Sequence, residues 1–247
     1  MLGKLLTRFL RGAPAPAAPA PAPAPGDADN PLFEYFLDNP GRLIDKWHHY
    51  LEVYHRHFAR FRGKSPVIVE IGVWQGGSLQ MWHDYFGAGC RVVGIDIDPR
   101  CLEFADANTT ILIGDQGSRE FLATVREQVP RIDILIDDGG HFVAQQIATF
   151  EELYPHIQPN GVFLCEDMHS SLWRRFGGGV RHEGSFLEYS KALIDSLSAW
   201  HSEEPELLSV NRFTESTFSM HFYNSVLVIE KRPMAYPGHS RSGARAF

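Results

Sequence analysis

The sequence predicts an α/β fold, a doubly wound and mostly parallel sheet with helices on both faces and an antiparallel strand near the C-terminus. From Pro66 onward, short and almost wholly apolar segments alternate with segments of helical periodicity, which is typical of parallel strands buried on both faces. A last strand-like segment lies near residues 222–230, and residues 207–213 are its candidate partner. Apolar residues make up 44% of the 247-residue chain, enough for a large core.

The predicted elements follow one another in a simple order along the chain. Residues 42–62 come first and have helical periodicity. Five strands are predicted at 67–71, 91–97, 109–114, 132–137 and 161–167. Helices are predicted at 77–86, 100–106, 117–128 and 143–154, with a further one over 184–199. This alternation indicates a Rossmann-like domain.

The N-terminal part of the chain differs in composition from the rest. Residues 1–12 place leucines on one helical face and basic residues largely opposite, as in a helix on a membrane surface or a partner, although a disordered tail explains them too. Residues 13–29 form a linker rich in proline and alanine, which we expect to be extended. An N-terminal helical region then spans 30–65, the sheet domain 66–232 and a flexible tail 233–247.

Composition argues against several classes of protein. The net charge of −7 disfavours broad nucleic-acid binding, which needs a basic surface, although a local basic patch stays open. Cys90, Cys101 and Cys165 are odd in number and lack C-x-x-C spacing, so neither a disulfide framework nor a zinc site is expected. No apolar run approaches the ~20 residues of a membrane span. We expect a cytoplasmic protein, with membrane association conceivable only through residues 1–12.

Four histidines lie in the predicted helix 42–62: His48, His49, His55 and His57. A metal site would need histidines spaced i, i+4 on one face, with a carboxylate nearby. A histidine-rich surface is the simpler interpretation.

A glycine-containing turn follows the first predicted strand in VEIGVWQGGS, residues 69–78. The spacing of Gly72 and Gly76 is typical of a loop that a ligand approaches closely, but the G-x-G-x-x-G and Walker motifs are absent. Asp96 ends the second strand, where a carboxylate can accept both hydroxyls of a ribose. Asp115 and Gln116 end the third strand, beside the expected position of an adenine. Ligands of open α/β sheets bind at these carboxyl ends.

Together with Glu70, these features resemble the class I S-adenosylmethionine-dependent methyltransferases. The resemblance implies that S-adenosylmethionine is the cofactor and that Glu70, Gly72 and Gly76 line its methionine and ribose part. It also implies that Asp96 binds the ribose and Asp115 the adenine. A different Rossmann-like domain with coincidental acidic residues is the alternative.

Acidic residues also follow the fourth and fifth strands, in IDDGGH and CEDMHS. Neighbouring parallel strands lie ~4.8 Å apart, so Asp138, Glu166 and Asp167 can converge on one cation, and oxygen ligands favour a hard ion such as Mg²⁺. Asp137 is not included among the predicted metal ligands, because capping of the following turn by its side chain is an equally good explanation. His141 follows through two glycines that permit a sharp turn, so it could act there as a general base or be a structural residue at a helix start.

A narrower resemblance covers about residues 43–231. The segments HHYLEVYHRHF, GVWQGGSLQMW, DDGGH, EDMHSSLW and HFYNSVLVIEK resemble the metal-dependent sugar O-methyltransferases of the macrocin and mycinamicin type and the rhamnosyl O-methyltransferases. The resemblance implies that Asp138, Glu166 and Asp167 bind Mg²⁺ and that His141 is the base. Gly140 stands where that group commonly has serine, which should leave the chemistry intact.

The resulting prediction is an S-adenosylmethionine- and Mg²⁺-dependent O-methyltransferase acting on a sugar hydroxyl of a glycosylated metabolite or glycan. A catechol-type enzyme for aromatic diols and a non-catalytic S-adenosylmethionine-binding partner protein are the alternatives. Hydroxylation is disfavoured, because non-haem iron needs two histidines with one carboxylate. Residues 170–184, with Arg174, Arg175 and Arg181, either meet the acceptor or coat a mobile lid, and His169 is read as a loop residue. We expect a small-molecule or glycan acceptor, no nucleic-acid partner and a homo-oligomer.

Overall fold

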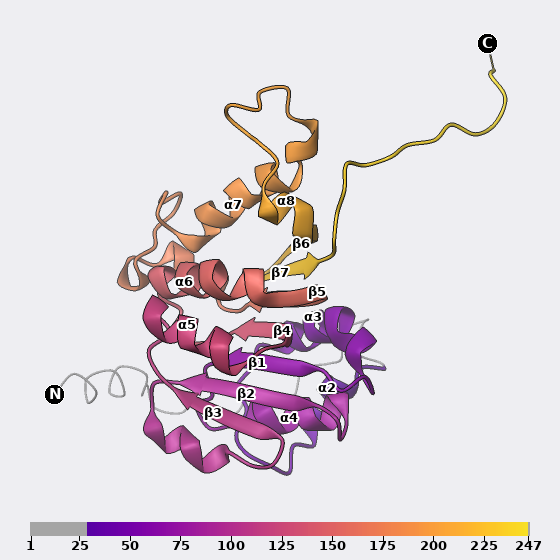
Figure 1. Cartoon of the computed structure of the whole chain (residues 1–247). Helices are drawn as coiled ribbons and strands as arrows, with labels where there is room; N and C mark the ends of the chain where they lie inside the picture. Colours follow the sequence, from indigo (N-terminus) through magenta and orange to yellow (C-terminus); the bar gives the residue numbers. More distant parts are fainter. Residues whose placement is uncertain (1–28, 247) are drawn as a thin grey trace.

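The computed structural model describes residues 29–246, and in it seven strands form one sheet in the order β3-β2-β1-β4-β5-β7-β6 (Figure 1). The strands are β1 (Val67–Ile71), β2 (Arg91–Asp96), β3 (Thr109–Ile113), β4 (Ile132–Asp137), β5 (Ile157–Cys165), β6 (Thr217–Tyr223) and β7 (Val226–Lys231). β1 to β5 pair in parallel, whereas β7 runs antiparallel to both β5 and β6. The predicted fold class is confirmed. The strand order reverses between β1 and β4, and ligands of such sheets bind at this switch point.

Helices cover both faces of the sheet. They are α2 (Pro31–Leu37), α3 (His48–Phe58), α4 (Gly77–Phe86), α5 (Arg119–Gln128), α6 (Val143–Leu153), α7 (Phe186–Leu197) and α8 (Arg212–Ser216). In Figure 1, α5 and α6 lie in front of the strands and α4 behind them. Among the described residues, no helix combines the length and the apolar character needed to cross a membrane.

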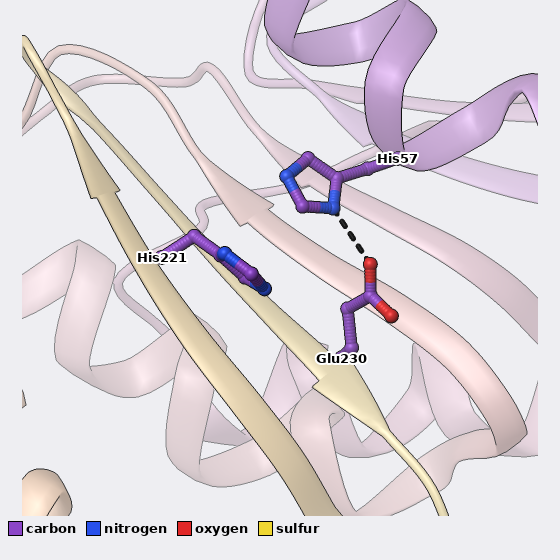
Figure 2. Close-up of side chains that lie close together, drawn as sticks. All are labelled: His57, His221 and Glu230. Carbon is purple, nitrogen blue, oxygen red and sulfur yellow. Dashed lines mark hydrogen bonds and ion pairs between the residues drawn. The ribbon is translucent and has the colours of Figure 1, made fainter.

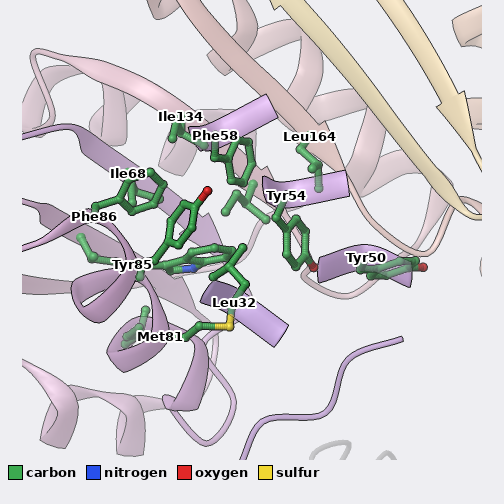
Figure 3. Close-up of a cluster of buried hydrophobic side chains, with 14 of the residues drawn as sticks. Leu32, Tyr50, Tyr54, Phe58, Ile68, Met81, Tyr85, Phe86, Ile134 and Leu164 are labelled. Atoms are coloured by element: carbon green, nitrogen blue, oxygen red, sulfur yellow. The ribbon is translucent and has the colours of Figure 1, made fainter. Parts of the chain in front are cut away.

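The alternation of side chains along each strand divides the core into two layers. Ile68 and Ile134 pack in the layer under α2, α3 and α4, whereas their neighbours Val69 and Leu135 pack in the layer under α5, α6 and α7. Figure 3 shows the first layer, in which aromatic side chains of α3 and α4 meet the strands. This layer matters for function because α3 also reaches the end of the sheet where the polar residues gather.

Two predicted elements differ from the structure. Of the predicted helix 42–62, residues 48–58 are α-helical and Ala59–Phe61 continue as a 3₁₀ helix, whereas residues 39–47 form an irregular segment that is held by contacts distant in sequence. The partner of the last strand is 217–223 and not 207–213. Asn211 begins a short helix there through a capping box with Thr214, which removes its neighbours from strand pairing.

His57 is buried, so the interpretation of the four helix histidines as a surface feature is wrong for this residue. Its Nδ1 lies 2.7 Å from Oε1 of Glu230 in β7, and its Nε2 lies 2.9 Å from the hydroxyl of Tyr223 in β6. Figure 2 shows His57 of α3 above Glu230, with His221 of β6 nearby. Since both ring nitrogens of His57 already have partners and Arg60 also donates to Glu230, the cluster joins α3 to the sheet edge.

The predicted segment 1–12 and all of the predicted linker 13–29 except its last residue lie outside the described residues. Residues 233–246 contain no helix or strand. Cys90, Cys101 and Cys165 are free and buried. Burial raises the pKa of the Cys90 thiol to about 12, so this thiol stays protonated at neutral pH.

Candidate active site

Of the acidic residues at the ends of β4 and β5, Asp137 faces one side of the sheet, and Asp138 and Glu166 face the other. Ile136 of β4 is paired with Leu164 of β5, and both side chains belong to the core layer under α3. Because side chains alternate between faces, Asp138 and Glu166, two positions further along, point towards the same layer. Asp137 points away from it and is fully buried. The pair Asp137 and Asp138 therefore separates into one residue for each side of the sheet, whereas Glu166 and Asp167 both contact α3, through Tyr54 and Tyr50.

A lysine from outside the sheet lies between the two carboxylates that face α3. Nζ of Lys46 donates to Oε1 and Oε2 of Glu166 at 2.9 and 2.8 Å and forms an ion pair with Asp138. The side chains of Lys46 and Glu166 are only 4% and 2% exposed. Tyr54 in α3 donates to Oε1 of Glu166 at 2.5 Å. Four polar side chains from three separate parts of the chain thus meet in a nearly closed site.

Asp167 and His141 complete the cluster on its more open side. Nε2 of His141 lies 3.4 Å from Oδ2 of Asp167 and 4.0 Å from Oδ1 of Asp138. Ligand atoms of Asp138, His141 and Asp167 all lie within 4.8 Å of one another. Tyr50 in α3 donates to Oδ1 of Asp167 at 2.8 Å. The four residues predicted for metal binding and base catalysis are therefore neighbours in space.

Burial and like charge dominate the electrostatics of this cluster. Burial raises the pKa of Glu166 well above its usual range, and the neighbouring Asp138 raises it further. For Lys46, burial alone would lower the pKa, but Asp138 and Glu166 outweigh it and the net pKa is raised. The Lys46 ammonium therefore balances the charge of the crowded carboxylates Asp138 and Glu166, and this group of oxygens attracts positive charge strongly.

Two expectations about the turn after β4 need correction. His141, and not the glycines before it, adopts the positive φ of 57°. Gly139 and Gly140 are needed for space, because an added Cβ would lie 2.2 Å from Gln116 Oε1 in one case and Gln145 Oε1 in the other. Gln116 was predicted to lie beside an adenine. Its buried amide instead donates to Asp137 Oδ1 at 2.6 Å and accepts from Gly140 N at 3.1 Å.

The residues predicted for the methionine part of the cofactor lie at the end of β1. Glu70 is fully buried, accepts from Ser78 Oγ at 2.9 Å and leaves Oε1 without a hydrogen-bond partner. Burial raises the pKa of Glu70 to about 7. Gly72 has a φ of 98°, and a Cβ there would lie 2.0 Å from the backbone oxygen of Asp138. Gly76 has a φ of 70° and precedes α4.

Asp96 and Asp115 differ in how much of their acceptor capacity the protein uses. Oδ2 of Asp96 accepts from Val73 N and Trp74 N at 2.9 and 3.0 Å, and its Oδ1 accepts from Asp98 N at 2.9 Å. A carboxylate offers about four acceptor positions, so roughly one remains for a ligand. Asp115 is exposed and uses only Oδ1, which accepts from the amide of Gly117 at 2.7 Å.

A cleft of about 440 Å³ opens beside the carboxylates. Asp138, Glu166 and Asp167 line it on one side, and residues 45–48 with Tyr50 line it on the other. Trp47 is 60% exposed at this cleft, and its ring lies 6.4 Å from that of His169. Nδ1 of His169 lies 2.5 Å from Ser225 Oγ and 3.8 Å from Oδ1 of Asp167, at the margin of the cluster.

The loop 170–184 contributes aromatic and basic side chains. The ring of Trp173 is 4.6 Å from that of His169, and the guanidinium of Arg175 stacks 4.4 Å from the centre of the Trp173 ring. Arg174 and Arg181 are exposed.

Sequence reasoning missed Lys46 as a member of the site. Its partners Asp138 and Glu166 lie 92 and 120 residues away along the chain, and no spacing motif links them. The one available signal was electrostatic, since converging buried carboxylates require a counter-charge. Tyr50 and Tyr54 were similarly hidden, because aromatic residues on an apolar helix stripe are usually explained by packing alone.

This strand order, with a glycine turn after β1 and carboxylates after the next strands, resembles the fold of the class I S-adenosylmethionine-dependent methyltransferases. The comparisons agree: a family model described as a methyltransferase domain matches residues 69–168. These residues form a methyltransferase domain, and the chain resembles the metal-dependent sugar O-methyltransferases.

Individual relatives show how far the likeness extends. The chain is 33% identical over 207 residues to a rhamnosyl tetracenomycin-C 2'-O-methyltransferase of Streptomyces olivaceus, covering 79% of this chain and 53% of that protein. It is also 33% identical to the mycinamicin VI 2''-O-methyltransferase of Micromonospora griseorubida, over 74% of this chain and 48% of that protein. The structure of MycE in complex with Mg and SAH matches with a TM-score of 0.75 at 29% identity, over 82% of this chain and 54% of that one. The chain thus spans about half the length of the relatives it matches.

Proposed function

We propose that this protein is an S-adenosylmethionine- and Mg²⁺-dependent O-methyltransferase that acts on a sugar hydroxyl, with His141 as the general base. One observation carries the proposal: carboxylates from the ends of β4 and β5 converge, and the imidazole of His141 lies beside them. Relatives named for 2'- and 2''-O-methylation of glycosylated compounds support the substrate class.

The donor set fits a hard divalent cation. Asp138, Glu166 and Asp167 would hold the ion, because carboxylate oxygens are the ligands that Mg²⁺ prefers, and the site already attracts an ammonium. When bound, such an ion lowers the pKa of an acceptor hydroxyl and neutralises charge that develops on its oxygen. Mg is present in the MycE complexes, which is consistent with this assignment.

His141 has the surroundings that a general base needs. Its Nε2 is close to two carboxylates, which stabilise the imidazolium formed when the ring takes a proton from the acceptor hydroxyl. Nε2 is the ring nitrogen that faces the acid cluster, whereas the buried Nδ1 has no hydrogen-bond partner among residues 29–246. The positive φ of His141 is a strained arrangement that such a role would explain.

The cofactor would lie along the carboxyl ends of β1, β2 and β3. The unpartnered Oε1 of Glu70 is suited to the ammonium of the methionine part, and the free acceptor position of Asp96 to a ribose hydroxyl. Asp115 remains our proposal for the adenine side. Gly72 and Gly76 would act by shaping the turn, because the space a Cβ would need there is filled by Asp138 and Phe104.

The acceptor would enter the cleft between Asp138 and Trp47. Exposed indole rings of Trp47 and Trp173 offer flat apolar faces beside the polar cluster, an arrangement suited to a sugar ring that carries both C–H and O–H groups. Residues 170–184 would then set the specificity for the rest of the acceptor.

The deciding experiment is mass-spectrometric detection of a product heavier by one CH₂ from a panel of glycosides, glycans and nucleotide sugars, with catechols included. Sugar methylation that needs Mg²⁺ and stops with chelator is expected. Methylation unchanged by chelator contradicts the metal mechanism, and methylation of catechols alone indicates the catechol-type enzyme.

His141→Ala should abolish turnover while the protein still binds S-adenosylhomocysteine, measured by calorimetry. A partner protein without catalysis would show no turnover in either form.

We also propose that the protein acts in the cytoplasm as a homo-oligomer, with residues 1–12 as a contact to a membrane surface or a partner. The amphipathic pattern of this segment supports the contact. Light scattering gives the oligomeric state. Flotation with anionic vesicles, compared with a chain that lacks residues 1–12, tests the membrane contact.

A further inference from the structure

We propose that Lys46 occupies the divalent-cation site of the metal-free protein and leaves it when the ion binds, carrying residues 39–47 with it. This inference rests on the proposed function, because it assigns Asp138 and Glu166 to the metal. Its basis is the placement of one ammonium against both carboxylates, within hydrogen-bond distance of each.

The first argument is that Lys46 and a divalent ion cannot share this site. The Nζ atom contacts three oxygens of Asp138 and Glu166, the same oxygens that a Mg²⁺ ion would need at about 2.0–2.1 Å. Two cations at such a separation repel strongly where water is largely excluded. The side chain of Lys46 is 4% exposed, so the ammonium is not already solvated and must move as a whole.

The second argument is that the backbone around Lys46 belongs to no helix or strand. Residues 39–47 contain no helix or strand, and the Lys46 ammonium is their deepest polar attachment. The remaining hydrogen bonds of the segment lie nearer its start: Arg42 N donates to Gln80 Oε1 at 2.8 Å, and Asn39 Nδ2 to the carbonyl of Arg42 at 2.8 Å. Such a segment can swing out without breaking a regular element.

The third argument links this movement to the cofactor turn. A Cβ on Gly77 would lie 2.3 Å from the carbonyl oxygen of Leu43, and Arg42 Nη1 lies 3.5 Å from the carbonyl oxygen of Gly76. The guanidinium of Arg42 also stacks 4.5 Å from the centre of the Phe104 ring. Residues 41–44 therefore cover the start of α4, so departure of Lys46 exposes the turn as well as the carboxylates.

The test is calorimetric titration of Mg²⁺ alone into the wild-type protein and into Lys46→Met, which keeps the chain length and removes the charge. If the ammonium fills the site at least about nine-tenths of the time, its removal tightens the Mg²⁺ Kd about tenfold or more. By linkage, the metal-free Lys46→Met protein should melt at a lower temperature than wild type and gain more from saturating Mg²⁺. Lys191→Met, an exposed lysine paired only with Glu188 on α7, is the matched control and should bind as wild type does.

The outcomes separate the two proposals. Equal Mg²⁺ Kd values for wild type and Lys46→Met overturn the competition but leave the magnesium site intact. No Mg²⁺ binding by either protein overturns the metal part of the proposed function itself. If Lys46→Met does not fold, hydrogen exchange of the wild type decides: saturating Mg²⁺ should speed exchange of residues 39–47, and an unchanged rate refutes the movement.

Discussion

Replacing Tyr54 with phenylalanine isolates the hydrogen bond that anchors Glu166. The phenol ring is fully buried, stacked on Phe58 with centroids 5.9 Å apart and edge-on to Trp82 at 5.3 Å, and phenylalanine retains these contacts. What is lost is one O–H donor to a carboxylate at 2.5 Å. Hydrogen bonds to charged groups contribute about 1.5–3 kcal/mol. Since Lys46 still donates to the same oxygen, we expect the lower part of this range.

The measurement is urea unfolding followed by tryptophan fluorescence, with thermal melting beside it. For a domain of this size, 1 kcal/mol corresponds to roughly 2–4 °C, so Tyr54→Phe should lower the melting temperature by about 3–8 °C. Tyr54→Ala should cost about 3–5 kcal/mol more, because the ring leaves a cavity.

Tyr85→Phe is the matched control. Tyr85 is also buried, but its hydroxyl meets the imidazole of His55 at 2.8 Å, so the expected cost is about 0.5–1.5 kcal/mol. If Tyr54→Phe is as stable as wild type, or no less stable than Tyr85→Phe, the assignment of a charged hydrogen bond at Glu166 is refuted.

Two further predictions concern stability away from the carboxylate cluster. Gly72→Ala should lower the free energy of unfolding by about 2–5 kcal/mol, because φ is positive there and a Cβ would clash with Asp138. Gly63→Ala has a positive φ but open space, so it should cost only about 1–2 kcal/mol. Equal losses for the two variants in urea unfolding would contradict the clash. The hydrogen bond from His57 and the nearby Arg60 lower the pKa of Glu230 to about 2, against an ordinary value of 4.5. The charged Glu230 therefore stabilises the fold above pH 4.5, and this stabilisation is lost as the pH falls from about 4.5 to 2. Glu230→Gln should lose about 1–2 kcal/mol of stability at pH 7, which is less than the full pKa shift implies because the carboxylate keeps some solvent contact. Between pH 4.5 and 2 the stability of this variant should vary less than that of wild type. Parallel profiles of stability against pH for the two proteins would contradict the ion pair.

The regular centre of the sheet was predictable, because its information is local. The strands at 67–71 and 132–137 and the helix at 77–86 have the bounds that apolar runs and glycine turns indicated. The convergence of Asp138 and Glu166 also followed from local signals, since neighbouring parallel strands end at the same edge of a sheet.

The parts that were missed depend on contacts distant in sequence. Residues 42–47 have an apolar spacing that fits a helix, but Lys46 reaches the sheet end and Arg42 reaches Gln80, so the chain stays irregular there. Gln116 was misread for the same reason, because nothing near it in sequence reveals that Asp137 needs a donor. A hydrogen bond from one side chain to a buried group far away in the sequence produces no periodic pattern of residues, so local spacing does not predict it.

The ammonium between β4, β5 and α3 also bears on how the chain matures. Buried carboxylates without a counter-charge would oppose the packing of α3 against the sheet. A protein with such carboxylates and no lysine beside them would fold its core only after an ion had bound. Here the nascent polypeptide supplies its own positive charge. The core can therefore assemble before the proposed Mg²⁺ ion binds.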